Sequence, residues 1–156
     1  ATFRTVRVTT KRHRLPGRLA LSTGMTPETT FCDPRSIARL SRALVSTDPR
    51  EHFLAFYLGN ANRLLAAHVV SIGTSDSASV HPREVYLPAV HLGATSVVVA
   101  HNHPSGSVAP SREDLLVTER LREAGTLLGI DFLDHVIFDQ HGKTLYSFSS
   151  GTSLQG

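Results

Sequence analysis

Two histidines and one aspartate form a group of side chains whose types and spacing suit metal chemistry. The segment VVVAHNHPSGSVAPSRED contains His101, His103 and, eleven residues further on, Asp114. If the apolar run before His101 is a β-strand, side chains two residues apart leave the same face, so both imidazoles point to one side. The loop that follows is long enough to turn back over them. Two neutral imidazoles and one carboxylate suit zinc, and three protein ligands leave a fourth position for water, as in catalytic zinc sites.

The same residues also have a purely structural interpretation. A His-x-His pair at a strand end is often two polar residues in a loop, and Ser-x-x-Asp is a common start of a helix. Ser111 would then cap that helix, and Asp114 would lie in its first turn facing the positive end of the dipole. The two interpretations are compatible, because a capped first turn would also hold the Asp114 carboxylate still.

The motif His-x-His, seven residues, Ser, two residues, Asp resembles that of the JAMM (MPN-plus) metalloproteases. The longer string HNHPSG…PSREDLLVTERLREAG…DFLDHVI resembles their bacterial RadC branch, and the likeness covers residues 49–148. The resemblance implies a zinc hydrolase with an α/β fold, in which helices flank a mixed β-sheet similar to that of cytidine deaminase. It also implies a glutamate at the start of an upstream strand, a position that Glu51 in EHFLAFYLG matches.

This resemblance implies a role for each site residue. Glu51 would be the general base and Ser111 the donor to the oxyanion, while the zinc ligands would be His101, His103 and Asp114. The expected reaction is hydrolysis of a peptide or isopeptide bond in a peptide or protein substrate.

A different function stays open because of the N-terminal segment. The whole chain carries a formal net charge of +3. Six basic residues precede the first acidic residue, Glu28: Arg4, Arg7, Lys11, Arg12, Arg14 and Arg18. A basic arm can bind DNA, although charges on an edge strand also discourage aggregation. With the RadC family's historical link to DNA repair, the arm keeps open a metal-dependent nuclease or DNA-binding module. Nucleases often hold two metals bridged by several carboxylates, and the single candidate carboxylate ligand favours the peptidase.

Length and composition favour one globular domain. The chain has 156 residues with 40% hydrophobic content, enough for a proper core. No apolar run approaches the length of a membrane span and no signal-peptide pattern appears, so no membrane contact is expected. One cysteine, Cys32, cannot form an internal disulfide, which favours a reducing, cytoplasmic setting. The single domain is expected to consist of a basic arm at 1–30, a motif-bearing core at 49–148 and a frayed tail at 149–156.

Local patterns predict alternating strands and helices. A hairpin is expected from two strands joined by turn residues, and its second strand is apolar enough to be covered on both faces. Helix caps are expected at Asp33 and Ser111. The predicted helices cover 35–45, 81–94 and 110–129; the predicted strands cover 51–58, 64–72, 95–100, 131–138 and 144–148.

Two dipeptides have roles that the sequence leaves undecided. Asp134-His135 resembles an Asp-His pair of the RadC family, and it is either an orienting pair behind the metal histidines or an internally satisfied pair. Arg83-Glu84 also matches the RadC pattern, and a solvated salt bridge is its default role. His68 is predicted to be a packed core histidine, and the polar loop at 73–80 is predicted to border the active cleft.

Overall fold

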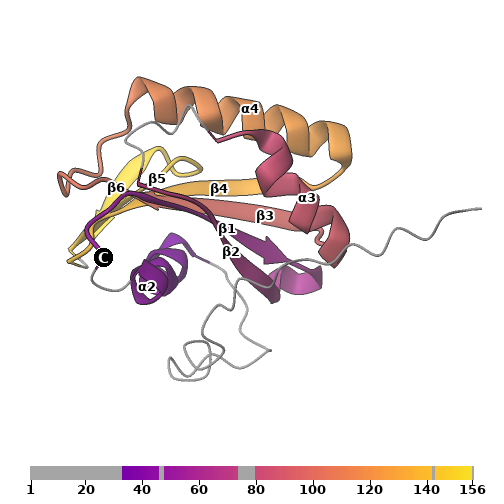
Figure 1. Ribbon diagram of the computed structural model, residues 1–156, viewed down its shortest axis with the longest axis horizontal. Helices are drawn as coiled ribbons and strands as arrows, with labels where there is room; N and C mark the ends of the chain where they lie inside the picture. Colours follow the sequence, from indigo (N-terminus) through magenta and orange to yellow (C-terminus); the bar gives the residue numbers. More distant parts are fainter. Residues whose placement is uncertain (1–32, 46–47, 74–79, 142, 156) are drawn as a thin grey trace, which may run out of the picture.

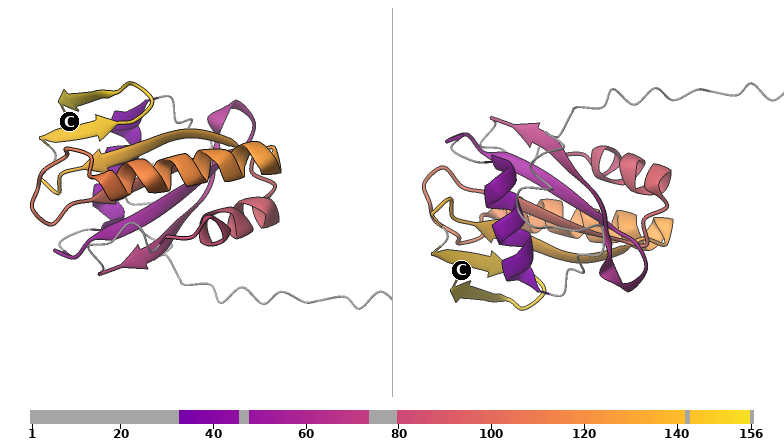
Figure 2. Two further views of the ribbon diagram at one scale, coloured as in Figure 1. Left: turned by 90° about the horizontal axis from the view of Figure 1, so that it is seen from above. Right: turned by 90° about the horizontal axis from the view of Figure 1, so that it is seen from below.

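A six-stranded mixed sheet with helices on both faces forms the protein. The computed structural model describes residues 33–45, 48–73, 80–141 and 143–155. The strand order is β2-β1-β3-β4-β5-β6, with α3 and α4 over one face and α2 over the other (Figures 1 and 2). The predicted α/β fold with a mixed sheet flanked by helices is confirmed. The strands are β1 (His52–Leu58), β2 (Leu64–Ile72), β3 (Ser96–Asn102), β4 (Asp131–Phe138), β5 (Thr144–Ser147) and β6 (Thr152–Gln155); the helices are α2 (Pro34–Val45), α3 (Pro82–Leu92) and α4 (Arg112–Leu128).

The central strands β1 and β3 are buried along their whole length. Alternate residues of β1 face opposite layers: Phe53 and Tyr57 pack under α3 and α4, whereas Leu54 and Phe56 pack against α2. Burying each such side chain stabilises the fold by about 1.5–3 kcal/mol. Because both faces are covered, β1 and β3 form a rigid base, and the ends of these two strands carry the candidate site.

The hairpin between β1 and β2 forms as predicted, but its second strand lies at an edge. A short 3₁₀ turn, Asn60–Asn62, joins the two strands. Among the described residues β2 pairs with β1 alone, and eight of its nine residues are half-buried, the last being exposed. The two faces of β2 pack against the two core clusters, for example through Val69 on one face and Val70 on the other, so both faces are covered in part. Its apolar composition does not distinguish a central strand from an edge strand that is partly shielded.

The segment β3–α4–β4 forms a parallel crossover over one face of the sheet. Strands β3 and β4 run parallel, with Ser96 opposite Asp131, and α4 connects them. The helix ends at Gly129, whose φ of 68° lies in the left-handed region that glycine tolerates. Gly125 is needed for close approach to α3, since a Cβ there would lie 2.6 Å from the Tyr86 hydroxyl. These constraints fix the axis of α4 above β3 and β4.

The start of α2 matches the sequence prediction. The Asp33 carboxylate accepts a hydrogen bond from the Ser36 amide at 3.1 Å, as an N-cap does, and Pro34 is the first helical residue. Inward-facing residues of α2, including Ile37 and Leu40, join the core on the second face of the sheet.

The C-terminal tail is more ordered than predicted. Residues 152–155 form β6, which pairs antiparallel with β5 from Thr144↔Gln155 to Ser147↔Thr152. The prediction of a frayed tail over 149–156 is therefore wrong for this strand. Its four residues, TSLQ, include a single apolar residue, Leu154, which packs against the core. One apolar residue gives no hydrophobic alternation, but backbone hydrogen bonds to β5 need none.

Several sequence predictions lie outside the described residues. These are the basic arm at 1–30, Cys32 and most of the polar loop at 73–80. None of the helices in the described ranges combines the length and the apolar character needed to span a membrane.

Candidate metal centre

His101, His103 and Asp114 converge at the end of β3. Their ligand atoms all lie within 4.8 Å of one another. His101 Nε2 is 3.1 Å from Asp114 Oδ1, and His103 Nε2 is 3.2 Å from Asp114 Oδ2. The two Nε2 atoms are themselves 2.8 Å apart. The three residues that the sequence singled out therefore form one group that could hold a metal ion.

The position of Asp114 is fixed by the start of α4. The Ser111 backbone N–H donates to Asp114 Oδ2 at 2.8 Å, and the Asp114 backbone N–H donates to Ser111 Oγ at 3.1 Å. This reciprocal pair is a capping box. The carboxylate therefore has two functions at once, because it caps the helix and also faces both imidazoles. The structural and metal-binding interpretations of Ser-x-x-Asp describe the same geometry.

A chain of hydrogen bonds determines which nitrogen of His101 carries the proton. The Thr118 hydroxyl donates to the Asp114 carbonyl at 2.5 Å, and its oxygen lies 2.6 Å from His135 Nδ1. Since its one proton is used, Thr118 accepts from His135 Nδ1–H. His135 Nε2 then holds a lone pair and accepts from His101 Nδ1–H at 2.7 Å. Assigned from this network, the proton of His101 lies on Nδ1 and its Nε2 lone pair faces Asp114.

His103 has the same tautomer for a simpler reason. Its Nδ1 lies 2.8 Å from the Ser107 carbonyl oxygen, which can only accept. Nδ1 therefore carries the proton in the neutral ring, and Nε2 holds a lone pair. The two Nε2 lone pairs and the Asp114 carboxylate then point at one another without a proton among them. This arrangement is repulsive unless a cation or a proton lies between them. Two imidazole nitrogens and a carboxylate are a donor set that zinc accepts, so the residues fit such an ion.

Burial sets the charge state of the histidines. His101 and His135 are fully buried, and this burial lowers the pKa of both below the ordinary histidine value. Both rings therefore stay neutral at pH 7. The His103 side chain is 17% exposed, and its hydrogen bond to Asp114 raises its pKa. For Asp114, burial acts to raise the pKa, but the two histidines that face its carboxylate lower it below its ordinary value.

Zinc affinity is expected to fall as the pH falls through the raised pKa of His103. The free site gains a proton on His103, which pairs with Asp114, whereas a metal needs the neutral ring. Above this pKa no proton competes, and below it each pH unit weakens binding by up to about tenfold. Competition with a chromogenic chelator between pH 6 and 8.5 measures the effect. An affinity that is constant over this range would contradict the proton on His103.

Glu51 lies on the same side as the two histidines. Pairing of Phe53 with His101 in the β1–β3 ladder, extended by two residues, puts Glu51 opposite His103. Side chains alternate, so Glu51 shares a face with Phe53, whose ring stacks on that of His101 at 5.8 Å. Glu51 is only 9% exposed, and after the hydrogen bond to Asp114 its charge is a further cause of the raised pKa of His103. This carboxylate thus lies on the face of the sheet that carries the candidate ligands.

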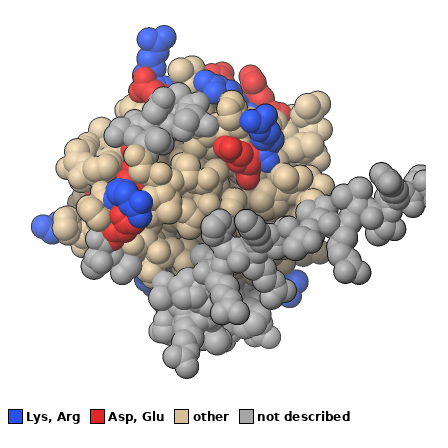
Figure 3. All heavy atoms as spheres, viewed as in Figure 1, with Lys and Arg blue, Asp and Glu red and all other residues tan. Residues whose placement is uncertain are grey.

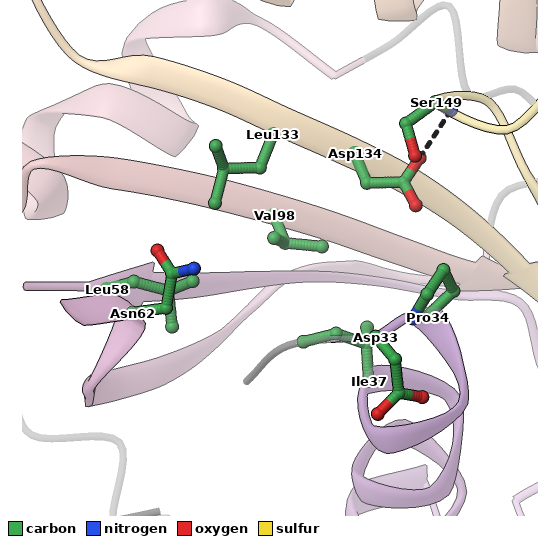
Figure 4. Close-up of a pocket in the computed structure, with 9 residues that line it drawn as sticks. All are labelled: Asp33, Pro34, Ile37, Leu58, Asn62, Val98, Leu133, Asp134 and Ser149. Carbon is green, nitrogen blue, oxygen red and sulfur yellow. Dashed lines mark hydrogen bonds between the residues drawn. The ribbon is translucent and has the colours of Figure 1, made fainter. Parts of the chain in front are cut away.

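The two members of Asp134-His135 face opposite sides of the sheet. His135 contacts His101, and Phe148 stacks on it with 4.8 Å between ring centroids. Asp134 instead accepts a hydrogen bond from the Ser147 hydroxyl at 2.7 Å. It also accepts one from the Ser149 amide at 2.9 Å, which Figure 4 shows. The orienting role is therefore supported for His135 alone, and Asp134 is satisfied internally.

A cavity of about 160 Å³ lies on the α2 side of the sheet. Ile37, Val98 and Asp134 line it (Figure 4). Val98 belongs to the hydrophobic cluster against α2, whereas His101 is three residues further along β3 and faces the other side. This cavity is therefore separate from the candidate metal centre.

The capping role of Glu84 was not anticipated. The Glu84 carboxylate accepts from the His81 backbone N–H at 3.1 Å and so caps α3. The predicted solvated salt bridge with Arg83 is not the role that the structure gives to this carboxylate.

Shortening His135 to asparagine is expected to weaken zinc binding by about 10–100-fold. The shorter side chain loses the acceptor for His101 Nδ1–H, so the tautomer and ring orientation of His101 are no longer fixed. Glutamine, which reaches further, is expected to restore part of the affinity. His91→Asn changes an exposed histidine on α3 and serves as the control. Equal zinc dissociation constants for His135→Asn and the unchanged protein would contradict the relay.

Comparison with known proteins gives a consistent family. The profile of the RadC-like JAB domain matches residues 30–153. A UPF0758 protein of Rubrobacter xylanophilus is 46% identical over 124 residues, which cover 80% of this chain and 50% of the relative. A UPF0758 protein of Methanosarcina acetivorans is 45% identical over 111 residues, covering 71% of this chain and 48% of the relative. A UPF0758 protein of Desulforamulus reducens is 53% identical over 95 residues, covering 61% and 42%.

The chain spans about half the length of these curated relatives. The profile match covers most of the described residues, including the three candidate ligands and Glu51. The chain therefore belongs to the RadC-like JAB domain family.

Proposed function

We propose that this chain is a zinc-dependent hydrolase that cleaves peptide or isopeptide bonds. The observation that supports the proposal is the convergence of His101, His103 and Asp114, whose metal-binding atoms face one another. The Glu51 carboxylate lies on the same face of the sheet. Family membership adds to it, since the JAB domain is similar to that of the JAMM metalloproteases.

In this proposal His101, His103 and Asp114 hold the ion. When bound, zinc would act as a Lewis acid and lower the pKa of a coordinated water to about 7. Glu51 accepts the proton of the attacking water and later passes it to the leaving amine. The partial exposure of His103 leaves this side of the site open to a substrate.

Ser111 is proposed to stabilise the oxyanion. Its Oγ accepts from the Asp114 amide, so its own O–H is not used by the helix cap. The capping box also fixes the backbone on which this hydroxyl stands. A donor that is already oriented needs no reorganisation during the reaction. Ser111→Ala is expected to lower kcat by about 10²-fold or more while leaving zinc bound. Alanine loses the hydroxyl, so the capping contact from the Asp114 amide goes with it, and Ser111→Thr is the control that keeps both.

A cleavage screen of peptides against oligonucleotides tests the substrate class. We expect chelator-sensitive cleavage of peptide or isopeptide bonds and no cleavage of oligonucleotides. Zinc analysis of protein purified without added metal should give about one ion per chain, since one group of suitable residues is present in the described ranges. Zinc-free preparations, or cleavage that chelators do not affect, would contradict the proposal.

A DNA-associated role is the second candidate, and the six basic residues before Glu28 are the observation that favours it. On the face that Figure 3 shows, basic and acidic side chains of the described residues are interspersed. Phosphate binding by this segment should weaken steeply as salt is added. Deletion of residues 1–20 is expected to abolish it. Unchanged DNA binding by the deletion variant would end this hypothesis.

A further inference from the structure

Asn102 lies between the two histidines of the candidate metal centre and is completely buried. Because side chains alternate along β3, the Asn102 amide leaves the opposite face from His101 and His103. It therefore cannot serve as a ligand on their side. A buried amide needs partners for its donor and its acceptor, and the identity of these partners suggests a function.

Both partners of Asn102 belong to the peptide groups that flank Glu51. Asn102 Nδ2 donates to the Arg50 carbonyl at 3.0 Å, and the His52 backbone N–H donates to Asn102 Oδ1 at 2.9 Å. One side chain thus holds the backbone on both sides of Glu51. The Arg50 carbonyl also accepts from His52 Nδ1 at 2.9 Å, which ties the same two residues to each other.

Glu51 needs such support because it precedes the first residue of β1. On the β2 side, the Gly73 N–H donates to the Glu51 carbonyl at 2.9 Å. On the β3 side, the hydrogen bonds to its two neighbours come from Asn102. The backbone of Glu51 is therefore held from both adjacent strands, and the contact on the β3 side comes from the residue between the two candidate ligands.

We infer that Asn102 is a positioning residue, which holds the Glu51 carboxylate in register with His101 and His103. The inference rests on the proposed function, in which Glu51 is the general base. His101 and His103 leave one face of β3, and Asn102 holds the backbone of Glu51 from the other face. The spacing between the two histidines and Glu51 is therefore set by three consecutive residues. Displacement of a catalytic group by about 1 Å can reduce the rate by about 10²-fold.

Replacement of Asn102 with alanine is the first test. We expect kcat for a cleaved peptide to fall by about 10–10²-fold, with little change in KM and with zinc still bound at about one ion per chain. Added to Glu51→Gln, the same change should cause almost no further loss, because the residue that it positions is already inactive. Losses that multiply in the double variant would overturn the inference. Asn102→Ser, a milder change, replaces alanine if that variant does not fold.

A second measurement does not depend on activity. In the zinc-loaded protein, side-chain NMR relaxation of Glu51 should show greater mobility in Asn102→Ala than in the unchanged chain. Ser41→Ala is the control, since it removes another completely buried hydrogen-bonding group, within α2. It should lower stability without changing kcat or Glu51 mobility. Equal Glu51 mobility in the unchanged chain and Asn102→Ala would overturn the inference.

The two experiments distinguish failure of the positioning role of Asn102 from failure of the proposed hydrolase function. If the unchanged, zinc-loaded protein cleaves no peptide or isopeptide, the hydrolase proposal fails, and the mobility of Glu51 alone decides the role of Asn102. If cleavage occurs but Asn102→Ala retains the full kcat, the positioning role of Asn102 is ruled out and the hydrolase proposal stands.

Discussion

Replacing Glu51 with glutamine is expected to lower the kcat of peptide hydrolysis by about 10²–10⁴-fold while zinc stays bound. Glutamine keeps the size and hydrogen-bonding reach of the side chain, but its amide cannot take a proton from water. The three candidate ligands are unchanged, so metal content should match that of the unchanged protein. Parallel measurement of kcat and of zinc per chain checks both parts.

The control for this change is Glu113→Gln. Glu113 is an exposed acid in the first turn of α4, beside Asp114 in sequence but outside the group of ligands. It should leave both kcat and zinc content unchanged. If Glu51→Gln keeps full activity, Glu51 is not the base.

The second large effect is expected for Asp114→Asn, which should weaken zinc binding by more than the approximately 100-fold found for outer partners of a ligand. Asparagine can still accept the hydrogen bond from the Ser111 amide, so the start of α4 should be retained. The negative charge that faces both imidazoles is lost. Equilibrium dialysis followed by metal analysis measures the affinity, and hydrolysis should be lost in parallel at limiting zinc.

Circular dichroism distinguishes loss of the ligand from loss of the helix. A variant that retains helical content but no zinc supports the assigned role of Asp114. A variant that binds zinc as tightly as the unchanged chain would remove this carboxylate from the ligand set. Asp131→Asn, an exposed carboxylate at the start of β4, provides a matched control.

The local elements of the fold were predictable because their signals are short in range. The Asp33 cap, the Ser111 cap and the glycine at the end of α4 act within one turn of the chain, and each is present in the structure. The convergence of His101 and His103 also followed from strand alternation. That Asp114 reaches them was inferred from motif spacing rather than from any local rule.

The partners of these residues were harder to predict because they come from distant parts of the chain. His135 reaches His101 only through the parallel pairing of β3 and β4, and Thr118 reaches His135 because α4 packs over β4. Asn102 bonds backbone groups fifty and fifty-two residues away. Strand alternation predicts that the Asn102 side chain points away from the two histidines, but it does not predict its partners. The signal available in the sequence was a polar residue between two candidate ligands at the end of an expected strand.

The edges of the sheet were also beyond the reach of sequence patterns. An apolar strand such as β2 is compatible with a central or an edge position, and a short polar segment such as β6 carries no pattern that predicts pairing. Both outcomes depend on the order of strands, which is a property of the whole sheet.

The crossover β3–α4–β4 has a consequence for how the activity can change over time. All three candidate ligands, together with Thr118 and His135, belong to this one continuous stretch of chain, whereas Glu51 comes from a separate stretch before β1. Under the proposed function, replacement of the Glu51 counterpart alone would give homologues that still bind the ion but no longer hydrolyse substrate. Bound metal in a homologue would then be a poor indicator of hydrolysis unless its counterpart of Glu51 is also intact.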